Sequence, residues 1–454
     1  MMEGVLITPP FSYTLNKGNV EYKEVTNCRI CNSADLIPYL DLGNKPLPNN
    51  LSLQKDSVVS NYPLKVLLCK NCSLSQLSVV VPPSKMFKNY LYHSSVSDTF
   101  RTHCRSLSRK AEWMLKKEKG FSKECCCVID IAANDGCLLN QFEKLGFKWL
   151  IAVEPASNLT KKYQSKRIMA VNSFWEDAIV PSADIITATN VLAHVDGIVD
   201  FVTKIRDTLA KFRKSFCVVE VPYLYDLIKG NEFDTIYHEH LSYFLFKPLK
   251  ILFESAGLKI FKVERLKIHG GSLRIYSSLI NHSAIVYEKG YKPSGKKEDR
   301  EHCRYKKVTH FKEDRSVKSL LKFEEKNGLY DISFYEDFSR RVNLAKTKFI
   351  TFLENAYRDG KKVIGYCASA KGISLLNYFC VGERLLNAIV DDTPDKQGKF
   401  TPGSHLQIVS REYIDNFLPD YIVILSWNFS KEVMNKVKFK GKWVVAIPCL
   451  KIMK

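Results

Sequence analysis

The chain has 454 residues, of which 45% are hydrophobic, 12% aromatic and 26% charged. This composition is globular, the length favours about three domains of ~150 residues, and no apolar run reaches the ~18 residues of a membrane span. The formal charge of +20 suits a nucleic-acid partner, an anionic small substrate or a lysine-rich surface. Because the basic runs mix lysines with acids, nucleic acid is the less favoured partner. We expect no membrane contact.

The N-terminal region carries a predicted zinc site. The first residues show no signal peptide, so we expect a cytoplasmic protein in which the fourteen cysteines favour metal binding over disulfides. Two C-x-x-C pairs, Cys28 with Cys31 and Cys69 with Cys72, can bring four thiolates to one tetrahedral Zn²⁺. Unpaired core cysteines would not need the doubled spacing. Since all four ligands are thiolates, we predict a closed structural site.

The middle of the chain predicts a cofactor site. The segment "CCCVIDIAANDGCLLNQFEKLGF" indicates a buried strand over 126–131, a small-residue loop and a helix. The next strand, "WLIAVEP", ends on Glu154, where a carboxylate suits two ribose hydroxyls. The loop has only Gly136 in place of G-x-G-x-x-G, which favours S-adenosylmethionine over a dinucleotide. Asp130 could meet the methionine amino group. An ordinary tight turn is the alternative for the loop.

Further polar residues follow later strands. "ADIITATNVLAHV" and "SFCVVEVPY" predict parallel strands whose carboxyl ends carry Asn190, His194 and Glu220 to one crevice. The stretch "YHEH" then gathers a phenol, two imidazoles and a carboxylate, and "HGGSLR" contains Arg274 after two glycines that permit positive φ. A loop histidine with satisfied hydrogen bonds is the alternative for His194. A turn followed by a surface cation is the alternative for "HGGSLR".

The last third predicts a second, smaller doubly wound sheet. "KKVIGYCASAKGISLLNYF" again indicates strand, loop and helix, and it is preceded by a long amphipathic helix. Lys371 lies at the expected helix N-terminus, where amide groups and a cation favour an anion such as a diphosphate. A dehydrogenase-like module is the alternative, although the loop lacks spaced glycines.

Taken in order, these pieces carry a family resemblance. The chain resembles the S-adenosylmethionine-dependent nucleotide-sugar C-methyltransferases, which act on 4-keto deoxysugars. The family often has Glu where Asp130 stands and Gly-Ala before the lysine where this chain has residues 367–370, and the basic segment 287–322 matches poorly. The matching motifs are "CRIC", "CKNCSLSQL", "YLYHSSVS", "VIDIAANDGCLL", "VEPASN", "NVLAHVD", "YHEHLSYF", "HGGSLR", "GYCASAKG", "VDDTPDKQGKFTPGSH" and "LSWNF".

The resemblance implies an α/β fold with three domains: a zinc-binding domain over 1–88, a Rossmann-like methyltransferase core over 89–285 and a smaller Rossmann-like, nucleotide-sugar-binding domain over 286–454. It implies methyl transfer from S-adenosylmethionine to a carbon alpha to the ketone, through an enolate. A zinc-containing nucleic-acid-binding protein or nucleic-acid methyltransferase is the alternative. The sugar, the nucleoside, the methylated carbon and the oligomeric state stay open.

The resemblance also assigns roles to residues. It places "YHEH" at the catalytic centre, where we expect His240 to be the base, Tyr237 the enolate donor or an alternate base, and Glu239 an orienting partner. We expect His194 near the ketone or the methyl group. The expected cofactor contacts are Asp130, Ala132, Asn134, Asp135, Gly136, Glu154, Pro155 and Asn190, covered by a lid that contains Tyr90, Tyr92 and Ser95. The expected substrate contacts are His238, Glu220, His269, Arg274 and Lys371.

Overall fold

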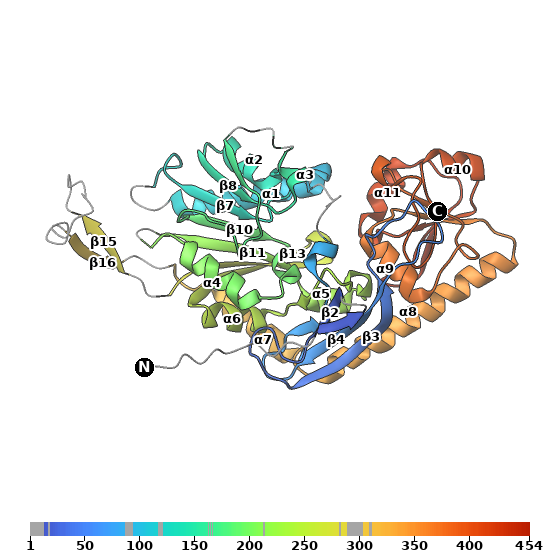
Figure 1. The fold of residues 1–454 in the computed structure, drawn as a ribbon, viewed down its shortest axis with the longest axis horizontal. Coiled ribbons are helices and arrows are strands. Elements are labelled where there is room, and N and C mark those ends of the chain that lie inside the picture. The colour runs from blue at the N-terminus through green and yellow to red at the C-terminus, as the bar shows by residue number, and fades with distance from the viewer. Residues whose placement is uncertain are drawn as a thin grey trace.

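The computed structural model shows three parts that follow one another along the chain (Figure 1). They are a cysteine-containing β-rich part, a central α/β part and a C-terminal α/β part, which confirms the predicted fold class. None of the helices within the described ranges is both long and apolar enough to cross a membrane. The structure describes residues 13–16, 19–86, 94–116, 121–161, 163, 165, 167–211, 214–280, 283–287, 303–307 and 311–454.

The N-terminal part contains two small sheets. One has the order β1-β2-β6 and the other the order β12-β5-β4-β3. The first part of strand β4 alternates buried Tyr62, Leu64 and Val66 with the less buried Pro63 and Lys65, as a strand covered on one face does. The strands are β1 (Tyr13–Asn16), β2 (Asn19–Glu24), β3 (Leu36–Pro46), β4 (Asn61–Cys69), β5 (Ser75–Leu77), β6 (Val79–Val80) and β12 (Ser242–Tyr243). Strand β12 comes from the central part, so the two parts share a sheet.

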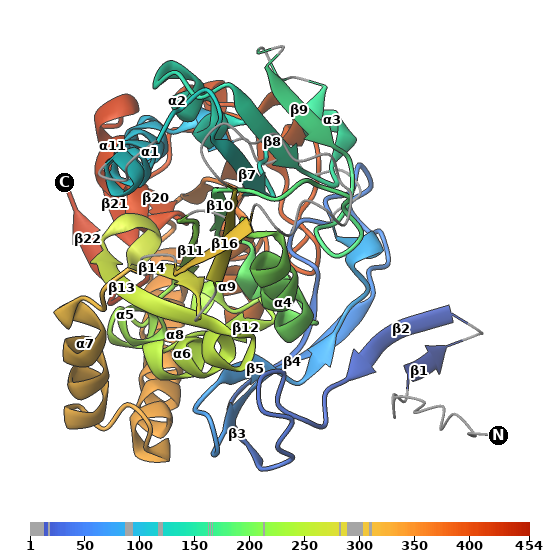
Figure 2. The same ribbon diagram turned by 90° about the vertical axis from the view of Figure 1, so that its left-hand side faces the viewer.

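The central part is built on a seven-stranded sheet with the order β13-β14-β11-β10-β7-β8-β9 (Figure 2). The pairs from β11 to β9 are parallel, whereas β14 runs antiparallel to β11 and to β13. The strands are β7 (Cys127–Ile131), β8 (Trp149–Val153), β9 (Ile168–Val171), β10 (Ile185–Thr189), β11 (Phe216–Pro222), β13 (Leu258–Leu266) and β14 (Ser272–Leu279).

Helices cover both faces of this sheet, which is why its strands are apolar on both sides. Val128 of β7 packs in the cluster of α1 and α2, whereas its neighbour Ile129 packs in the larger cluster that includes α4. The helices are α1 (Asp98–Lys116), α2 (Cys137–Lys144), α3 (Ser157–Thr160), α4 (Ile198–Thr208), α5 (Leu224–Lys229) and α6 (Phe246–Ser255), with short helices η1 (Pro83–Lys85), η2 (Ser94–Val96), η3 (Leu192–His194), η4 (Phe233–Thr235) and η5 (Ile268–Gly270).

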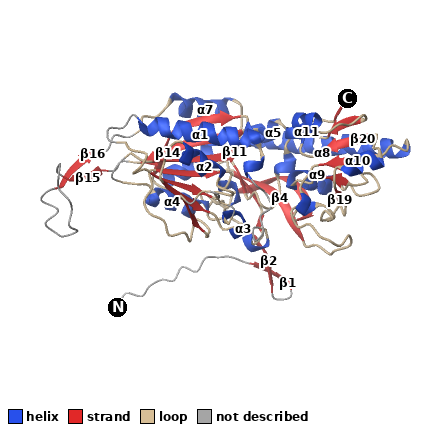
Figure 3. Ribbon diagram, turned by 90° about the horizontal axis from the view of Figure 1, so that it is seen from above, coloured by secondary structure: helices blue, strands red, loops and turns tan. Residues whose placement is uncertain are grey.

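After the central sheet, the chain forms a hairpin of β15 (Ser283–Tyr287) and β16 (Cys303–Lys307) that lies apart from the body of the protein (Figure 3). It then returns as α7 (Arg315–Lys326). The amide of Asp314 donates to Phe261 O over 2.7 Å, which attaches α7 to β13. A helix beyond the predicted boundary at residue 286 therefore packs on the central sheet, and the domain limits stay a prediction.

The C-terminal part begins with the predicted long helix, α8 (Ile332–Arg358). It runs beside β3 and leads to a six-stranded sheet with the order β19-β18-β17-β20-β21-β22, in which only β22 is antiparallel. This sheet confirms the second doubly wound unit. Its elements are β17 (Val363–Tyr366), α9 (Ala370–Phe379), β18 (Ile389–Val390), η7 (Pro394–Lys396), β19 (Ile408–Val409), α10 (Glu412–Phe417), β20 (Tyr421–Ile424), η8 (Trp427–Phe429), α11 (Ser430–Lys436), β21 (Lys442–Val445) and β22 (Lys451–Met453).

Candidate active site and zinc site

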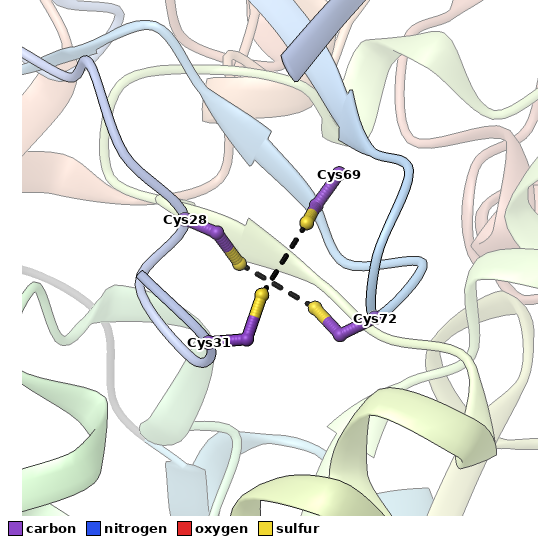
Figure 4. Close-up of side chains that lie close together, drawn as sticks. All are labelled: Cys28, Cys31, Cys69 and Cys72. Carbon is purple, nitrogen blue, oxygen red and sulfur yellow. Dashed lines mark hydrogen bonds between the residues drawn. The ribbon is translucent and has the colours of Figure 1, made fainter. Parts of the chain in front are cut away.

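The four predicted zinc ligands come together. Cys28 and Cys31 follow β2, and Cys69 and Cys72 flank the turn between β4 and β5 (Figure 4). The sulfurs of Cys28 and Cys72 are 3.4 Å apart, those of Cys31 and Cys69 are 3.5 Å apart, and all four lie within 4.8 Å of one another. Zinc with ~2.3 Å bonds needs sulfurs ~3.8 Å apart in a tetrahedron. This cluster therefore fits a closed zinc site with four cysteine ligands.

The loop that follows β7 has the geometry of a cofactor cradle. Ala132, Asn134 and Gly136 all adopt left-handed backbone conformations, with φ of 55°, 53° and 76°. The carboxylate of Glu154 lies behind this loop and accepts hydrogen bonds from the amides of Asn134 and Ala156, both over 2.9 Å. Burial raises the pKa of Glu154. Glu154 therefore holds the loop, and the cofactor contacts expected for Glu154 and Pro155 stay a prediction.

Two further predicted cofactor residues lie at the same edge of the sheet. Asp130 is buried and accepts a hydrogen bond of 2.6 Å from the Thr187 hydroxyl on β10. Burial raises the pKa of Asp130 to about 7. Asn190 follows β10 with φ of 57°, and its buried Oδ1 has no hydrogen-bond partner among the described residues. An acceptor left unsatisfied beside the loop suits a ligand that donates a hydrogen bond.

The segment predicted as a lid contacts this loop. The amide of Ser94 donates to Asn134 Oδ1 over 3.0 Å, and the amide of Ser95 donates to Asp135 Oδ2 over 2.8 Å. Tyr90 and Tyr92 lie outside the described residues. The short helix η2 is therefore attached to the loop of residues 132–136 through two side chains of the "AANDG" motif.

The "YHEH" stretch forms a turn that places His240 between Tyr237 and His194. The amide of His240 donates to Tyr237 O over 2.9 Å, which closes the turn. His240 Nδ1 lies 2.7 Å from Thr235 O, and because a carbonyl only accepts, Nδ1 carries the proton. Nε2 is then the basic nitrogen, and it lies 3.3 Å from the Tyr237 hydroxyl. The rings of His194 and His240 are 4.7 Å apart.

Both histidines of this cluster are held in the neutral form. Burial lowers the pKa of His194 to about 4. Burial, with further contributions from His194 and Lys371, lowers the pKa of His240 well below its usual value. Lys371 belongs to the C-terminal part, so its charge acts across the boundary between the two α/β units. The cluster therefore holds an unprotonated imidazole at neutral pH.

The other two side chains of "YHEH" contact the N-terminal part. Glu239 Oε1 accepts a hydrogen bond of 2.6 Å from Asn49, and burial raises the pKa of Glu239 to about 7. His238 is 1% exposed, and its Nε2 lies 3.2 Å from both Tyr62 O and Pro63 O of β4. The turn thus sends His238 and His240 to different partners. The structure does not bring His238 to the His194–His240 cluster, and its predicted substrate contact stays a prediction.

Glu220 and Arg274 pair with each other. They are opposite residues of β11 and β14, and Arg274 Nε donates to Glu220 Oε1. The second oxygen of Glu220 lies 2.7 Å from Nε2 of His103 on α1. Glu220 is 1% and Arg274 3% exposed. The two charges therefore neutralise each other inside the protein, and the substrate contacts predicted for Glu220 and Arg274 stay a prediction.

The glycines of "HGGSLR" make room for two carboxylates. Gly270 and Gly271 have φ of 95° and 135°, and a Cβ at these positions would collide with the side chains of Glu232 and Asp226. Burial raises the pKa of Glu232 to about 8, although the positive charge of Lys371 acts to lower that pKa. The side chain of His269 lies outside what the structure describes, so its predicted substrate contact stays a prediction.

Comparison with known proteins finds three domain families in the same order as the three parts of the structure. Family models match in order: a zinc-binding domain at residues 28–87, a methyltransferase domain at 96–263 and a C-methyltransferase C-terminal domain at 300–448. The C-methyltransferase NovU of Streptomyces niveus is 28% identical over 439 residues, which cover 94% of this chain and 96% of the relative. Together these matches identify an S-adenosylmethionine-dependent C-methyltransferase homologous to NovU.

Solved methyltransferase structures are similar to less than half of this chain. Magnesium protoporphyrin IX methyltransferase from Synechocystis with bound S-adenosylmethionine is 9% identical, with a TM-score of 0.31, over 40% of this chain and 82% of that one. An S-adenosylmethionine-dependent methyltransferase from Mesorhizobium loti is also 9% identical, with a TM-score of 0.29, over 37% of this chain and 97% of that one.

Several residues that complete the site of this C-methyltransferase were not found from the sequence. Asn49 and His103 meet Glu239 and Glu220 only through the fold. Asp234 lies three residues before "YHEH" and accepts a hydrogen bond of 3.0 Å from Trp427 of the C-terminal part. Trp427 belongs to the recognised motif "LSWNF", which was the available signal. The pairs Asn49–Glu239 and His103–Glu220 join residues that are far apart in the sequence, so no local sequence pattern predicts them.

Proposed function

We propose that this C-methyltransferase methylates the carbon alpha to the ketone of a nucleotide-linked 4-keto deoxysugar. The observation that carries the proposal is the tautomer of His240, whose Nδ1–H is fixed on Thr235 O and whose Nε2 is left basic beside the Tyr237 hydroxyl. A carbon next to a ketone becomes nucleophilic only after it loses a proton, so this chemistry needs such a base.

His240 takes the alpha proton of the sugar in this proposal. The electrons of the C–H bond then form the enolate, with negative charge on the former ketone oxygen. The Tyr237 hydroxyl, 3.3 Å from His240 Nε2, then donates a hydrogen bond to that oxygen in this proposal. When bound, S-adenosylmethionine supplies the methyl group that the enolate carbon attacks, and the S–CH₃ bond breaks as the C–C bond forms.

His194 and Glu239 complete the proposed catalytic set in different ways. The His194 ring, 4.7 Å from that of His240, bounds the space in which the ketone would lie. Glu239 is 3% exposed and fixed by Asn49, so it orients the turn from the side of the N-terminal part. The cofactor is assigned to the loop of Ala132 to Gly136 with Asp130, Glu154 and Asn190, where the left-handed backbone and the open Asn190 acceptor support it.

Lys371 is the proposed contact for the diphosphate. It lies in the first turn of α9, whose N-terminus is capped by Ser369 through a hydrogen bond from the Gly372 amide over 3.2 Å. The positive end of the helix and the lysine both favour an anion. Because Lys371 also lowers the pKa of His240, an anion that neutralises Lys371 would raise that pKa and strengthen the base.

The deciding experiment incubates the protein with S-adenosylmethionine and a panel of nucleotide-linked 4-keto sugars, followed by mass spectrometry and NMR of the products. We expect one new C–CH₃ group beside the ketone carbon. Methyl transfer to oxygen or nitrogen, or failure to methylate any keto sugar while S-adenosylmethionine binds, would overturn the proposal. Salt-dependent filter binding to DNA and RNA tests the alternative of a nucleic-acid substrate.

A further inference from the structure

Arg29 lies inside the first zinc knuckle, yet its side chain turns away from solvent. It stands between the ligands Cys28 and Cys31, and its side chain is 3% exposed. The guanidinium makes three hydrogen bonds, from Nε to Asp196 Oδ1 over 3.0 Å and from Nη1 to the carbonyls of Leu77 and Leu241 over 3.2 Å each. One buried cation thus joins three segments that are distant in sequence.

Two of these acceptors are next to the candidate catalytic histidines. Leu241 directly follows His240, and Asp196 lies two residues after His194. The Leu241 amide also donates to Ala193 O over 2.7 Å, so the two histidine segments are tied to each other. A displacement of the Arg29 guanidinium would therefore shift backbone that lies one residue from His240 and two residues from His194.

The third acceptor belongs to the sheet of the zinc domain. The Leu77 amide donates to Leu241 O over 2.9 Å, the same carbonyl that accepts from Arg29. The arginine backbone is fixed as well, because its amide donates to Gln76 Oε1 over 3.0 Å. The knuckle, strand β5 and the residue after His240 thus form one connected network.

We propose that Arg29 is a positioning residue for His194 and His240, so that the zinc knuckle supports the geometry of the catalytic centre. The inference rests on the proposed function only in assigning these two rings to catalysis. A displacement of about 1 Å at a reacting group can cost ~10²-fold in rate. Lys23 also bonds Asp196, over 2.9 Å, so loss of Arg29 would act mainly through Leu241.

The second knuckle supplies a matched control. Lys70 occupies the equivalent position after the first cysteine of its pair, Cys69. Its side chain is 57% exposed and its nearest carboxylate, Asp35, is 3.8 Å away. Lys70→Met therefore removes a cation from the same place in a zinc knuckle without touching a histidine segment.

The test compares Arg29→Met, Arg29→Lys and Lys70→Met in the full zinc-loaded chain. Zinc content, calorimetric affinity for S-adenosylmethionine, NMR signals of the His194 and His240 rings, and solvent exchange of the sugar alpha proton are measured. We expect Arg29→Met to keep its zinc and its cofactor affinity, to shift both ring signals and to slow exchange by ~10²-fold. Arg29→Lys should recover part of the loss, and Lys70→Met should behave as wild type.

The inference is wrong if zinc-loaded Arg29→Met gives the same His194 and His240 ring signals and the same exchange rate as Lys70→Met. If Arg29→Met fails to fold or loses zinc, Arg29→Lys decides, because it keeps a cation between the two cysteines but cannot bond Asp196 and both carbonyls at once; ring signals that do not shift in Arg29→Lys would then overturn the inference. If the ring signals shift but the wild type exchanges no keto-sugar proton, the proposed substrate is wrong and the role of Arg29 stands.

Discussion

Replacement of His240 by asparagine isolates the proposed proton abstraction. The side-chain amide of Asn can still donate to Thr235 O, the bond that Nδ1 makes over 2.7 Å, but it has no basic nitrogen at the place of Nε2. Loss of a general base costs ~10²–10⁴ in rate, which is about 3–5 kcal/mol in activation free energy. Tyr237 lies only 3.3 Å from Nε2. If its phenol takes over part of the role of the base, the loss in rate would lie near the lower end of this range.

The assay follows exchange of the sugar alpha proton with deuterated solvent by NMR in the absence of S-adenosylmethionine. His405→Asn is the matched control, since its Nδ1 also bonds a carbonyl, Lys55 O, over 2.7 Å but lies in the C-terminal part. Because burial lowers the pKa of His240 well below its usual value, wild-type exchange should be independent of pH above ~6.5 and fall only in acid. His240→Asn that exchanges as fast as wild type refutes the assignment, and loss of exchange in Tyr237→Phe alone would make the phenol the base.

Three further outcomes are expected. Purified protein should contain one zinc per chain by metal analysis, and Cys72→Ser should lower its thermal stability; a zinc-free, fully folded N-terminal part would contradict this. Glu154→Ala should lower the affinity for S-adenosylmethionine, measured by calorimetry, by ~10–100-fold because it removes a charged hydrogen-bond acceptor. An unchanged affinity would refute the assignment of Glu154 to the cofactor site. Burial lowers the pKa of His238 to about 4. As the pH falls from ~6.5 toward 4, the imidazole of His238 therefore takes up a proton in the unfolded state but not in the folded state. This difference lowers the free energy of unfolding by up to about 3 kcal/mol. His238→Asn should reduce that loss in urea titrations, and an unchanged pH dependence would argue against it.

Much of the fold could be predicted from local patterns. The strands β7, β8, β10 and β11 are short apolar runs that end in polar residues, and the pattern that marks them is contained within each run. The two C-x-x-C pairs carry their own spacing in the same way. The second α/β unit repeats the strand–loop–helix pattern, so it too was visible in the sequence.

The orientation of individual side chains could not be predicted in this way. Whether His238 or His240 faces the crevice depends on a tight turn closed by one backbone bond, from His240 N to Tyr237 O. Glu220 and Arg274 neutralise each other because of the register between β11 and β14, which no local pattern records. The pairing of β12 with β5 joins residues about 165 positions apart, and sequence separation of this size leaves no periodic signal.

That pairing has a consequence for the order in which the protein is made. Strand β5 emerges from the ribosome long before β12 (Ser242–Tyr243), its partner in the sheet. Until then β5 is an edge strand with unpaired backbone groups, the kind of edge that recruits other chains. Zinc can close the two knuckles early, because all four cysteines precede residue 73, and would hold β4 and β5 together during this interval. Translation at low zinc should therefore increase aggregation of nascent chains, even where the mature protein tolerates chelation.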